Sequence, residues 1–167
     1  MADKTLSPAE AEKAFWDHLK TSNTGMLGID QPGYHSQPMT AFREAETGTI
    51  WFFTLDTTDL ARDAAVTGRQ AMFTYGSKDQ ELWACIHGSL TVERNRETID
   101  RYWNPIVAAW YPGGKDDPHL TLLRFDADDG QVWVSKAGPI RFGYEIAKAN
   151  LTKTQPDVGA TARVNLN

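Results

Sequence analysis

Three threonine hydroxyls stand where an aromatic strand is expected to end and a helix to begin. Thr54 closes the apolar run 51–53, and Thr57 and Thr58 follow shortly after it. Threonine hydroxyls and the unpaired backbone N–H groups at a helix start both donate hydrogen bonds to phosphate oxygens. The same residues also suit a well-capped helix that binds no ligand. A phosphate site and a purely structural cap therefore both stay open at this point.

Other reactive side chains lack the spacing that catalysis or metal binding requires. Ser36 beside His35 cannot form a nucleophile–base pair, because neighbours on a strand point to opposite faces. Cys85 is the only cysteine, which excludes an intrachain disulfide, and it is expected to be a small buried residue. The histidines show no metal-ligand motif, and each is expected to be structural. They are His18, His35, His87 and His119. The sequence predicts no catalytic residue and no metal site.

The elements that would position these residues are mostly short strands. A first helix is predicted from Pro8 to about Lys20, because Ser7 and Glu10 form a capping box around Pro8. Strands are predicted at 24–30, 35–42, 49–54, 70–75, 82–92, 119–125 and 131–135, and further helices at about 59–66, 94–102 and 140–148. The last two strands are expected to form a hairpin that turns at Asp128–Gly130. Short turns without βαβ alternation favour a closed or partly open antiparallel barrel.

Length and composition suit one globular domain. The chain has 167 residues, of which 41% are hydrophobic and 23% charged, and we expect one domain at 1–150 followed by a loose C-terminal tail at 151–167. A net charge of −5 argues against nucleic acid or an anionic membrane as a partner. No signal-peptide core and no run of roughly 20 apolar residues is present. We therefore expect a cytoplasmic protein.

The segment 103–118 has the most unusual composition of the chain. It holds three aromatic residues, three prolines and a glycine pair, a mixture that regular secondary structure is not expected to absorb. Trp110 and Tyr111 on such a loop are expected to cover a ligand or a second subunit, or to fill the core. Lys115 within it could reach a ligand or a partner carboxylate, although a solvated lysine explains it equally.

Several motifs in a fixed order resemble one known family. They are His35-Ser36-Gln37-Pro38-Met39, Trp51-Phe52-Phe53-Thr54, Trp103-x-Pro followed by Trp110-Tyr111-Pro112-Gly113-Gly114, then Leu122-Leu123-Arg124 and Val132-Trp133. This order resembles the general stress protein branch of the pyridoxamine 5′-phosphate oxidase-like, FMN-binding split barrels, over roughly residues 10–140. The resemblance implies a mainly β fold with added helices, an antiparallel Greek-key split β-barrel of six to seven strands. It also implies a homodimer with a flavin, FMN or alternatively FAD, in each of two clefts at the subunit interface.

The resemblance implies that segments 35–40, 51–54 and 57–60 contact the flavin, and we add two residues of segment 103–118 as candidates. The predicted cofactor-binding residues are Ser36, Gln37, Pro38, Met39, Phe52, Phe53, Thr54, Thr57, Thr58, Asp59, Leu60, Trp110 and Lys115. Trp133 is expected in the core, with a flavin contact as the alternative.

Two positions depart from the family pattern. Gln37 stands where members usually carry Arg, and Leu60 where they carry Lys; both cations normally face the flavin phosphate. Each charge-assisted hydrogen bond is worth about 1.5–3 kcal/mol, so the loss matters unless another cation replaces them. Arg62 and Arg69 are near enough to do so, although Arg62 also suits a surface pair with a neighbouring aspartate. Weaker FMN binding, FAD binding and loss of the cofactor all stay open.

The function expected from the sequence is flavin binding of the general stress type. The protein would be either a flavin-dependent oxidoreductase or a flavin carrier, and the alternative is a non-enzymatic interaction protein on a barrel with a weakened phosphate site. Pyridoxamine 5′-phosphate oxidase activity itself is not expected, because the chain is short and shows no basic residues placed to hold the substrate phosphate.

Overall fold

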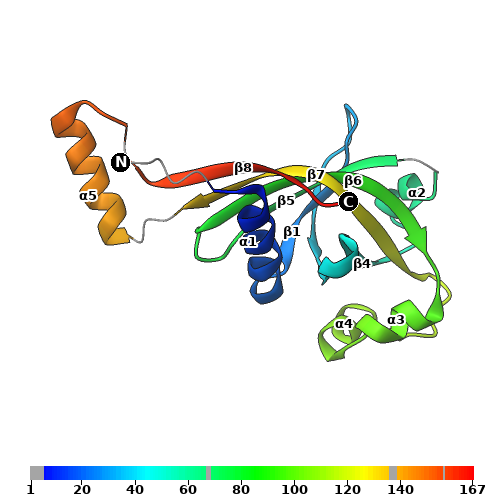
Figure 1. Ribbon diagram of the computed structural model, residues 1–167. Coiled ribbons are helices and arrows are strands. Elements are labelled where there is room, and N and C mark those ends of the chain that lie inside the picture. Colours follow the sequence, from blue (N-terminus) through cyan, green and yellow to red (C-terminus); the bar gives the residue numbers. More distant parts are fainter. Residues whose placement is uncertain (1–5, 67–68, 136–138, 156) are drawn as a thin grey trace.

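The computed structural model describes residues 6–66, 69–135, 139–155 and 157–167. Its strands are β1 (Thr24–Ile29), β2 (Gln37–Thr40), β3 (Phe42–Glu44), β4 (Thr49–Leu55), β5 (Arg69–Gly76), β6 (Leu82–Glu93), β7 (Leu120–Ser135) and β8 (Gly159–Asn165). Its helices are α1 (Pro8–Thr21), α2 (Asp59–Ala64), α3 (Arg96–Tyr102), α4 (Pro105–Trp110) and α5 (Pro139–Thr152), with a short 3-10 helix at Ala45–Thr47. The strands join one antiparallel sheet with the helices around it (Figure 1).

The sheet curls into a split barrel. Its strand order is β2-β1-β5-β6-β7-β4-β3, with β8 paired to β7. Strands β2 and β3 stand at opposite ends of this order, yet only Ala41 separates them in sequence. The two ends of the sheet must therefore meet at Ala41, which is buried and whose N–H donates to the carbonyl of Asn23. The predicted antiparallel split barrel is confirmed, and the predicted strand 35–42 is in fact broken at this corner.

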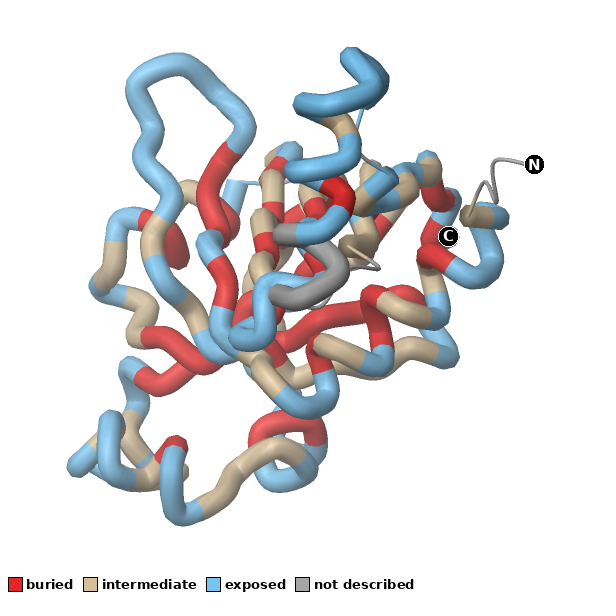
Figure 2. The backbone as a smooth tube through the Cα atoms, turned by 90° about the vertical axis from the view of Figure 1, so that its left-hand side faces the viewer, coloured by how far each residue is buried: buried red, intermediate tan, exposed pale blue. Residues whose placement is uncertain are grey.

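The main core lies between the inner face of the sheet and α1. Buried and less buried residues alternate along strands such as β5 and β6, as the two-residue strand period requires (Figure 2). Helix α1 contributes one apolar face, centred on Phe15 and Leu19, and packs against β6, β7 and β8. Burying a side chain such as Phe15 contributes about 1.5–3 kcal/mol to stability. The predicted capping box is confirmed, because the Ser7 side chain accepts from the Glu10 N–H and Glu10 accepts from the Ser7 N–H.

The hairpin predicted at Asp128–Gly130 is wrong. Strand β7 runs unbroken for 16 residues, and the extra residue, Asp128, forms a bulge opposite the His87/Gly88 step of β6. A Cβ on Gly130 would stand 2.5 Å from Ile86 Cδ1, so the glycine allows two strands to approach closely rather than making a turn. Two flanking strands, β6 and β8, hold this segment in the sheet.

The loose tail predicted after residue 150 is also wrong for its last part. Strand β8 pairs with β7 over its whole length, and Val164 and Leu166 join the main core. Within the described residues the sheet therefore has eight strands rather than six or seven. Helix α5 precedes β8 and stands at the far end of the β7–β8 ribbon from α3 and α4 (Figure 1). Among the described residues, none of the helices combines the length and apolar character that crossing a membrane requires.

Candidate functional site

Strand β2 turns Gln37 toward the barrel interior. Gln37 lies opposite Leu27 of β1, and Pro38 lies opposite Met26. Residues directly opposite each other in an antiparallel pair share a face, so Gln37 shares the face of the buried Leu27, while Pro38 shares the open face of Met26. The Gln37 amide donates weakly to the sulfur of Met39 at 3.6 Å. At this position β2 therefore offers a neutral amide.

The threonines at the start of α2 mostly satisfy one another. The Thr58 hydroxyl donates to the Leu55 carbonyl at 2.9 Å and accepts from the Ala61 N–H at 3.3 Å. Thr54 Oγ1 is 3.1 Å from Thr58 Oγ1, and Thr54 must be the donor because the Thr58 proton is already used. Both protons are thus committed to the helix cap. Of the three threonines, only Thr57 is exposed.

Four of the predicted cofactor residues, Phe52, Phe53, Thr54 and Leu60, are buried within this chain. Phe52 and Leu60 belong to the main core, where Leu60 packs at 7% exposure. Phe53 points to the opposite face of β4 and is also buried. In the described chain the side chains at these positions are buried. A flavin contact there stays a prediction, and backbone atoms would have to make it. Leucine suits position 60 because it faces an apolar interior.

Two cations were expected near the site, and in the described chain Arg62 pairs with a carboxylate whereas Arg69 does not. Arg62 pairs with Asp59 at 3.4 Å on the surface, which confirms the predicted surface pair. Arg69 begins β5 opposite the buried Leu90 and therefore shares the inner face of the sheet. Its Nη1 donates to Gln31 Oε1 at 3.1 Å, whereas its Nε is buried without a hydrogen-bond partner in the described part of the chain.

The predicted segments gather around the end of β1. A Cβ on Gly28 would stand 2.6 Å from Ser36 Oγ, so Ser36 lies directly over this strand. Helix α2 contacts β1 and β6, and the N–H of Asp30 donates to the Gln70 carbonyl, next to Arg69. Segment 36–40, helix α2 and Arg69 therefore meet at one end of the barrel, although they are distant in sequence.

Segment 103–118 does not lie at this end; together with α3 it forms a lobe, residues 96–118. The expectation that its composition excludes regular structure is wrong, because Pro105 occupies the first turn of α4 and Asn104 caps it, accepting from the N–H groups of Ile106 and Val107. The lobe packs on β4 through a second hydrophobic cluster. Its buried members are Trp51, Phe53, Ile99, Val107, Leu120 and Leu122.

The predicted ligand residues of the lobe divide into two kinds. The Tyr111 hydroxyl donates to the Phe53 carbonyl at 2.7 Å, and burial raises the pKa of this phenol. Lys115 Nζ lies 2.6 Å from Asp100 Oδ1, so its charge is balanced inside the lobe. Trp110, in contrast, ends α4 and is 79% exposed. Tyr111 and Lys115 hold the lobe together, and Trp110 alone of the three is open to a ligand or partner.

A second aromatic surface lies on the outer face of the sheet. Trp83 of β6 and Trp133 of β7 stand directly opposite each other, 52% and 42% exposed. The expectation that Trp133 fills the core is wrong. Its neighbour Val132 is fully buried, and a strand turns consecutive side chains to opposite faces.

Sequence reasoning missed Trp83, although the signal was present. Leu82 and Ala84 are buried on either side of it, and this apolar alternation indicates an outward tryptophan. Met26 on β1 is also exposed on this face, and Cys85 is half-buried rather than buried. Burial, followed by the charge of Asp30, raises the pKa of the Cys85 thiol.

Comparison with known proteins gives consistent matches. A family model described as pyridoxamine 5′-phosphate oxidase like matches residues 10–157. A solved structure from Jannaschia sp., assigned as general stress protein 26, is 38% identical, with a TM-score of 0.80, and the match covers 94% of this chain and 99% of that one. The general stress FMN/FAD binding protein of the phytopathogen Xanthomonas citri is 43% identical, with a TM-score of 0.71 and coverage of 78% and 92%. A general stress family protein of Xanthomonas campestris pv. campestris is 45% identical, with a TM-score of 0.70 and coverage of 83% and 93%. The search of curated proteins finds no match.

Proposed function

Because the chain belongs to the pyridoxamine 5′-phosphate oxidase-like family, we propose that it is a general stress protein that binds a flavin, FMN or FAD. The observation that carries this proposal is the match to the Xanthomonas citri protein, which is called FMN/FAD binding and is covered over 92% of its length at 43% identity. The gathering of segment 36–40, helix α2 and Arg69 at one end of the barrel supports it.

Arg69 is the cation that we assign to the flavin phosphate. Gln37 is neutral and Leu60 is buried, so neither supplies the charge that the family pattern places there. A guanidinium presents several N–H donors to one phosphate, and the Nε of Arg69 is buried without a partner in the described chain. A buried unpaired donor is costly, and a bound phosphate would satisfy it. The exposed hydroxyls of Ser36 and Thr57 supply neutral donors at the same end.

We assign the open tryptophan face to a homodimer. Trp83 and Trp133 form one aromatic surface, and the exposed Met26 lies on the same face of the sheet, two strands away from Trp83. Soluble monomers rarely expose contiguous apolar patches, and tryptophans are enriched where interfaces gain most of their energy. A second copy of this chain would cover the face and could bring further residues to each flavin.

Bound flavin supplies reversible electron transfer, which belongs to the cofactor. The chain's own task is to bind and orient it, and none of its residues is assigned an acid–base role. The alternative function is a flavin carrier without redox turnover. It is favoured by one observation: the protons of Thr54 and Thr58 are used within the cap, which leaves few donors for the phosphate.

The experiment starts with tag-free protein purified from cells. We expect a visible flavin absorption band, and extraction followed by mass measurement will distinguish FMN from FAD. Stripped protein should rebind the same flavin in a calorimetric titration. Reduction of the bound flavin by NADH or NADPH with multiple turnovers indicates an oxidoreductase, and binding without turnover indicates the carrier. Protein that neither co-purifies with nor rebinds any flavin would contradict the proposal.

A further inference from the structure

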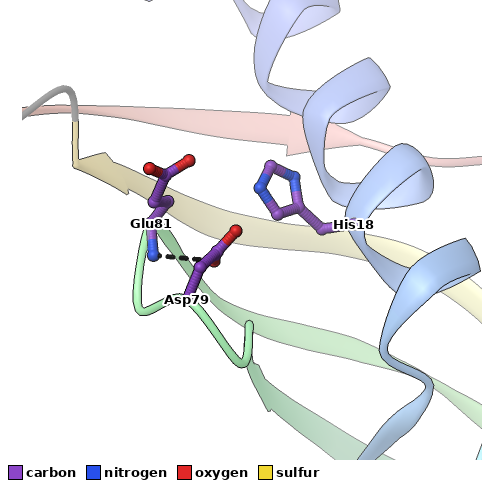
Figure 3. Close-up of side chains that lie close together, drawn as sticks. All are labelled: His18, Asp79 and Glu81. Carbon is purple, nitrogen blue, oxygen red and sulfur yellow. Dashed lines mark hydrogen bonds between the residues drawn. The ribbon is translucent and has the colours of Figure 1, made fainter. Parts of the chain in front are cut away.

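Three potential metal ligands converge where the end of α1 meets the turn between β5 and β6 (Figure 3). His18 comes from the last turn of α1, and Asp79 and Glu81 come from the turn between β5 and β6 (Figure 3). One ligand atom from each residue lies within 4.8 Å of the others. His18 is half-buried and both acids are exposed. Sequence spacing could not reveal this group, because the fold brings α1 to a turn far along the chain.

The tautomer of His18 is fixed in the form that binds metals. Its Nδ1 lies 2.8 Å from the Ala14 carbonyl, and a carbonyl can only accept, so Nδ1 carries the proton. In the neutral ring Nε2 then has a free lone pair, and Figure 3 shows this nitrogen on the side of the two carboxylates. Metal-binding histidines commonly donate their second nitrogen to a backbone carbonyl in this way.

The carboxylate of Asp79 is also oriented by its surroundings. Its Oδ1 accepts from the Ser77 hydroxyl and from the Glu81 N–H at 3.1 Å. These bonds hold one oxygen and leave Oδ2 for another partner. Asp79 is therefore presented to the space between the three residues by the turn itself, much as an outer-shell contact orients a metal ligand.

We propose that His18, Asp79 and Glu81 bind one divalent first-row metal ion, with Zn²⁺ as the reference ion. One neutral imidazole and two carboxylates form a mixed N/O set of charge −2, which balances a divalent cation. Imidazole favours zinc, cobalt or nickel over calcium and magnesium, which prefer oxygen ligands alone. Ligands about 2.1 Å from a tetrahedral ion stand about 3.4 Å apart, so the exposed carboxylates need to close by roughly 1 Å. Water completes the coordination, and the ion ties α1 to the β5–β6 turn.

The test is a zinc titration of tag-free, chelator-treated protein by calorimetry. We expect one saturable site per chain, and at least tenfold weaker binding in His18→Gln and in Glu81→Gln. The matched control is His87→Gln, because His87 also lies between two carboxylates. Its Nε2 is 3.5 Å from Asp30 and its Nδ1 is 3.7 Å from Asp129, so its two nitrogens face opposite partners and no ligand set converges on one point. Zinc affinity in this variant should equal that of the unmodified chain.

Two further measurements keep the proposal falsifiable if His18→Gln folds poorly. Zinc should raise the melting temperature of the unmodified chain by mass action but not that of Glu81→Gln, whose exposed turn position leaves the fold intact. Cobalt should give visible d–d absorption that Glu81→Gln loses. The proposal is overturned if the unmodified chain shows no saturable zinc binding, or if His87→Gln weakens binding as much as Glu81→Gln. Flavin content is expected to be the same with and without zinc, so this outcome is independent of the proposed function.

Discussion

The lobe at 96–118 and the outer face of the sheet both carry tryptophans, but only the lobe covers most of its aromatic rings within this chain. In the lobe, Trp103 and Tyr111 pack around Phe53, and Lys115 is paired with Asp100. On the sheet, Trp83 and Trp133 stand opposite each other and both are exposed. The lobe, which has the more unusual composition, is therefore the region whose aromatic rings and charges find more partners within the chain.

This difference shows that the unusual composition of a segment does not indicate whether its side chains are exposed. In the lobe, Asn104 caps α4, Pro105 lies in the first turn of this helix, and the segment folds back onto β4. The tryptophans of the sheet occur in ordinary strand sequences, and the strand period alone turns them outward. An unusual segment therefore identifies the family, while an ordinary alternating strand carries the surface that a partner can cover.

The largest expected effect comes from removing the ring that anchors the lobe. Phe53→Ala should lower the free energy of unfolding by about 3–5 kcal/mol, as for other buried phenylalanines, because Phe53 contacts the rings of Phe42, Trp103 and Tyr111. Urea unfolding curves of the unmodified chain and of Phe53→Ala, recorded at the same protein concentration, measure the change. The control is Ile106→Ala in the same lobe, where a side chain 73% exposed should cost no more than about 0.5 kcal/mol. Similar losses for the two variants would mean that the lobe is not packed as described.

The second test addresses the open face directly. The double substitution Trp83→Ser and Trp133→Ser should weaken dimerisation by about 2 kcal/mol or more, at least roughly thirtyfold, since buried tryptophans dominate interface energies. Sedimentation equilibrium gives the dissociation constants. Ile106→Ser removes an exposed apolar side chain from the lobe instead and should leave the dimer intact. A dimer that tolerates the tryptophan changes but dissociates in Ile106→Ser would move the interface to the lobe.

The sequence predicted most elements but not how the fold joins them. The capping box of α1, the strands and the short helix α2 follow from local patterns, and so does the curled antiparallel sheet. The hairpin at Asp128–Gly130 failed because a bulge and a turn use the same residue types, and only pairing with β6 and β8 decides between them. At the candidate site, the sequence indicated which residues to consider. It could not predict that Leu60 is buried or that Arg69 Nε is unpaired in the described chain, because both depend on contacts between distant segments.

The third test asks whether Arg69 binds the flavin phosphate. Arg69→Gln should weaken flavin binding about tenfold to a hundredfold, which corresponds to one charge-assisted hydrogen bond of about 1.5–3 kcal/mol. The matched control is Arg62→Gln, because Arg62 is exposed and pairs with Asp59; its flavin affinity should be unchanged. Calorimetric titration of stripped proteins measures both. Equal affinities for Arg69→Gln and the unmodified chain would remove Arg69 from the site and leave neutral donors alone to hold the phosphate.

The smallest expected effect concerns the charge balance inside the lobe. Lys115, and after it Arg96, lowers the pKa of the Asp100 carboxyl. Because the folded-state pKa lies below the unfolded value of about 3.9, the pair stabilises the fold at neutral pH, and this contribution is lost as the pH falls through the folded-state pKa. Lys115→Met should therefore raise the Asp100 pKa toward the unfolded value, as followed by an NMR pH titration of its carboxyl carbon. Arg96→Met should raise it less, since Arg96 Nε is 3.6 Å from Asp100 while Lys115 Nζ is 2.6 Å away. An unchanged Asp100 pKa in Lys115→Met would mean that Lys115 does not pair with Asp100 in the lobe. Its ammonium group would then be available to a ligand, just as the exposed Trp83 and Trp133 are available to a partner.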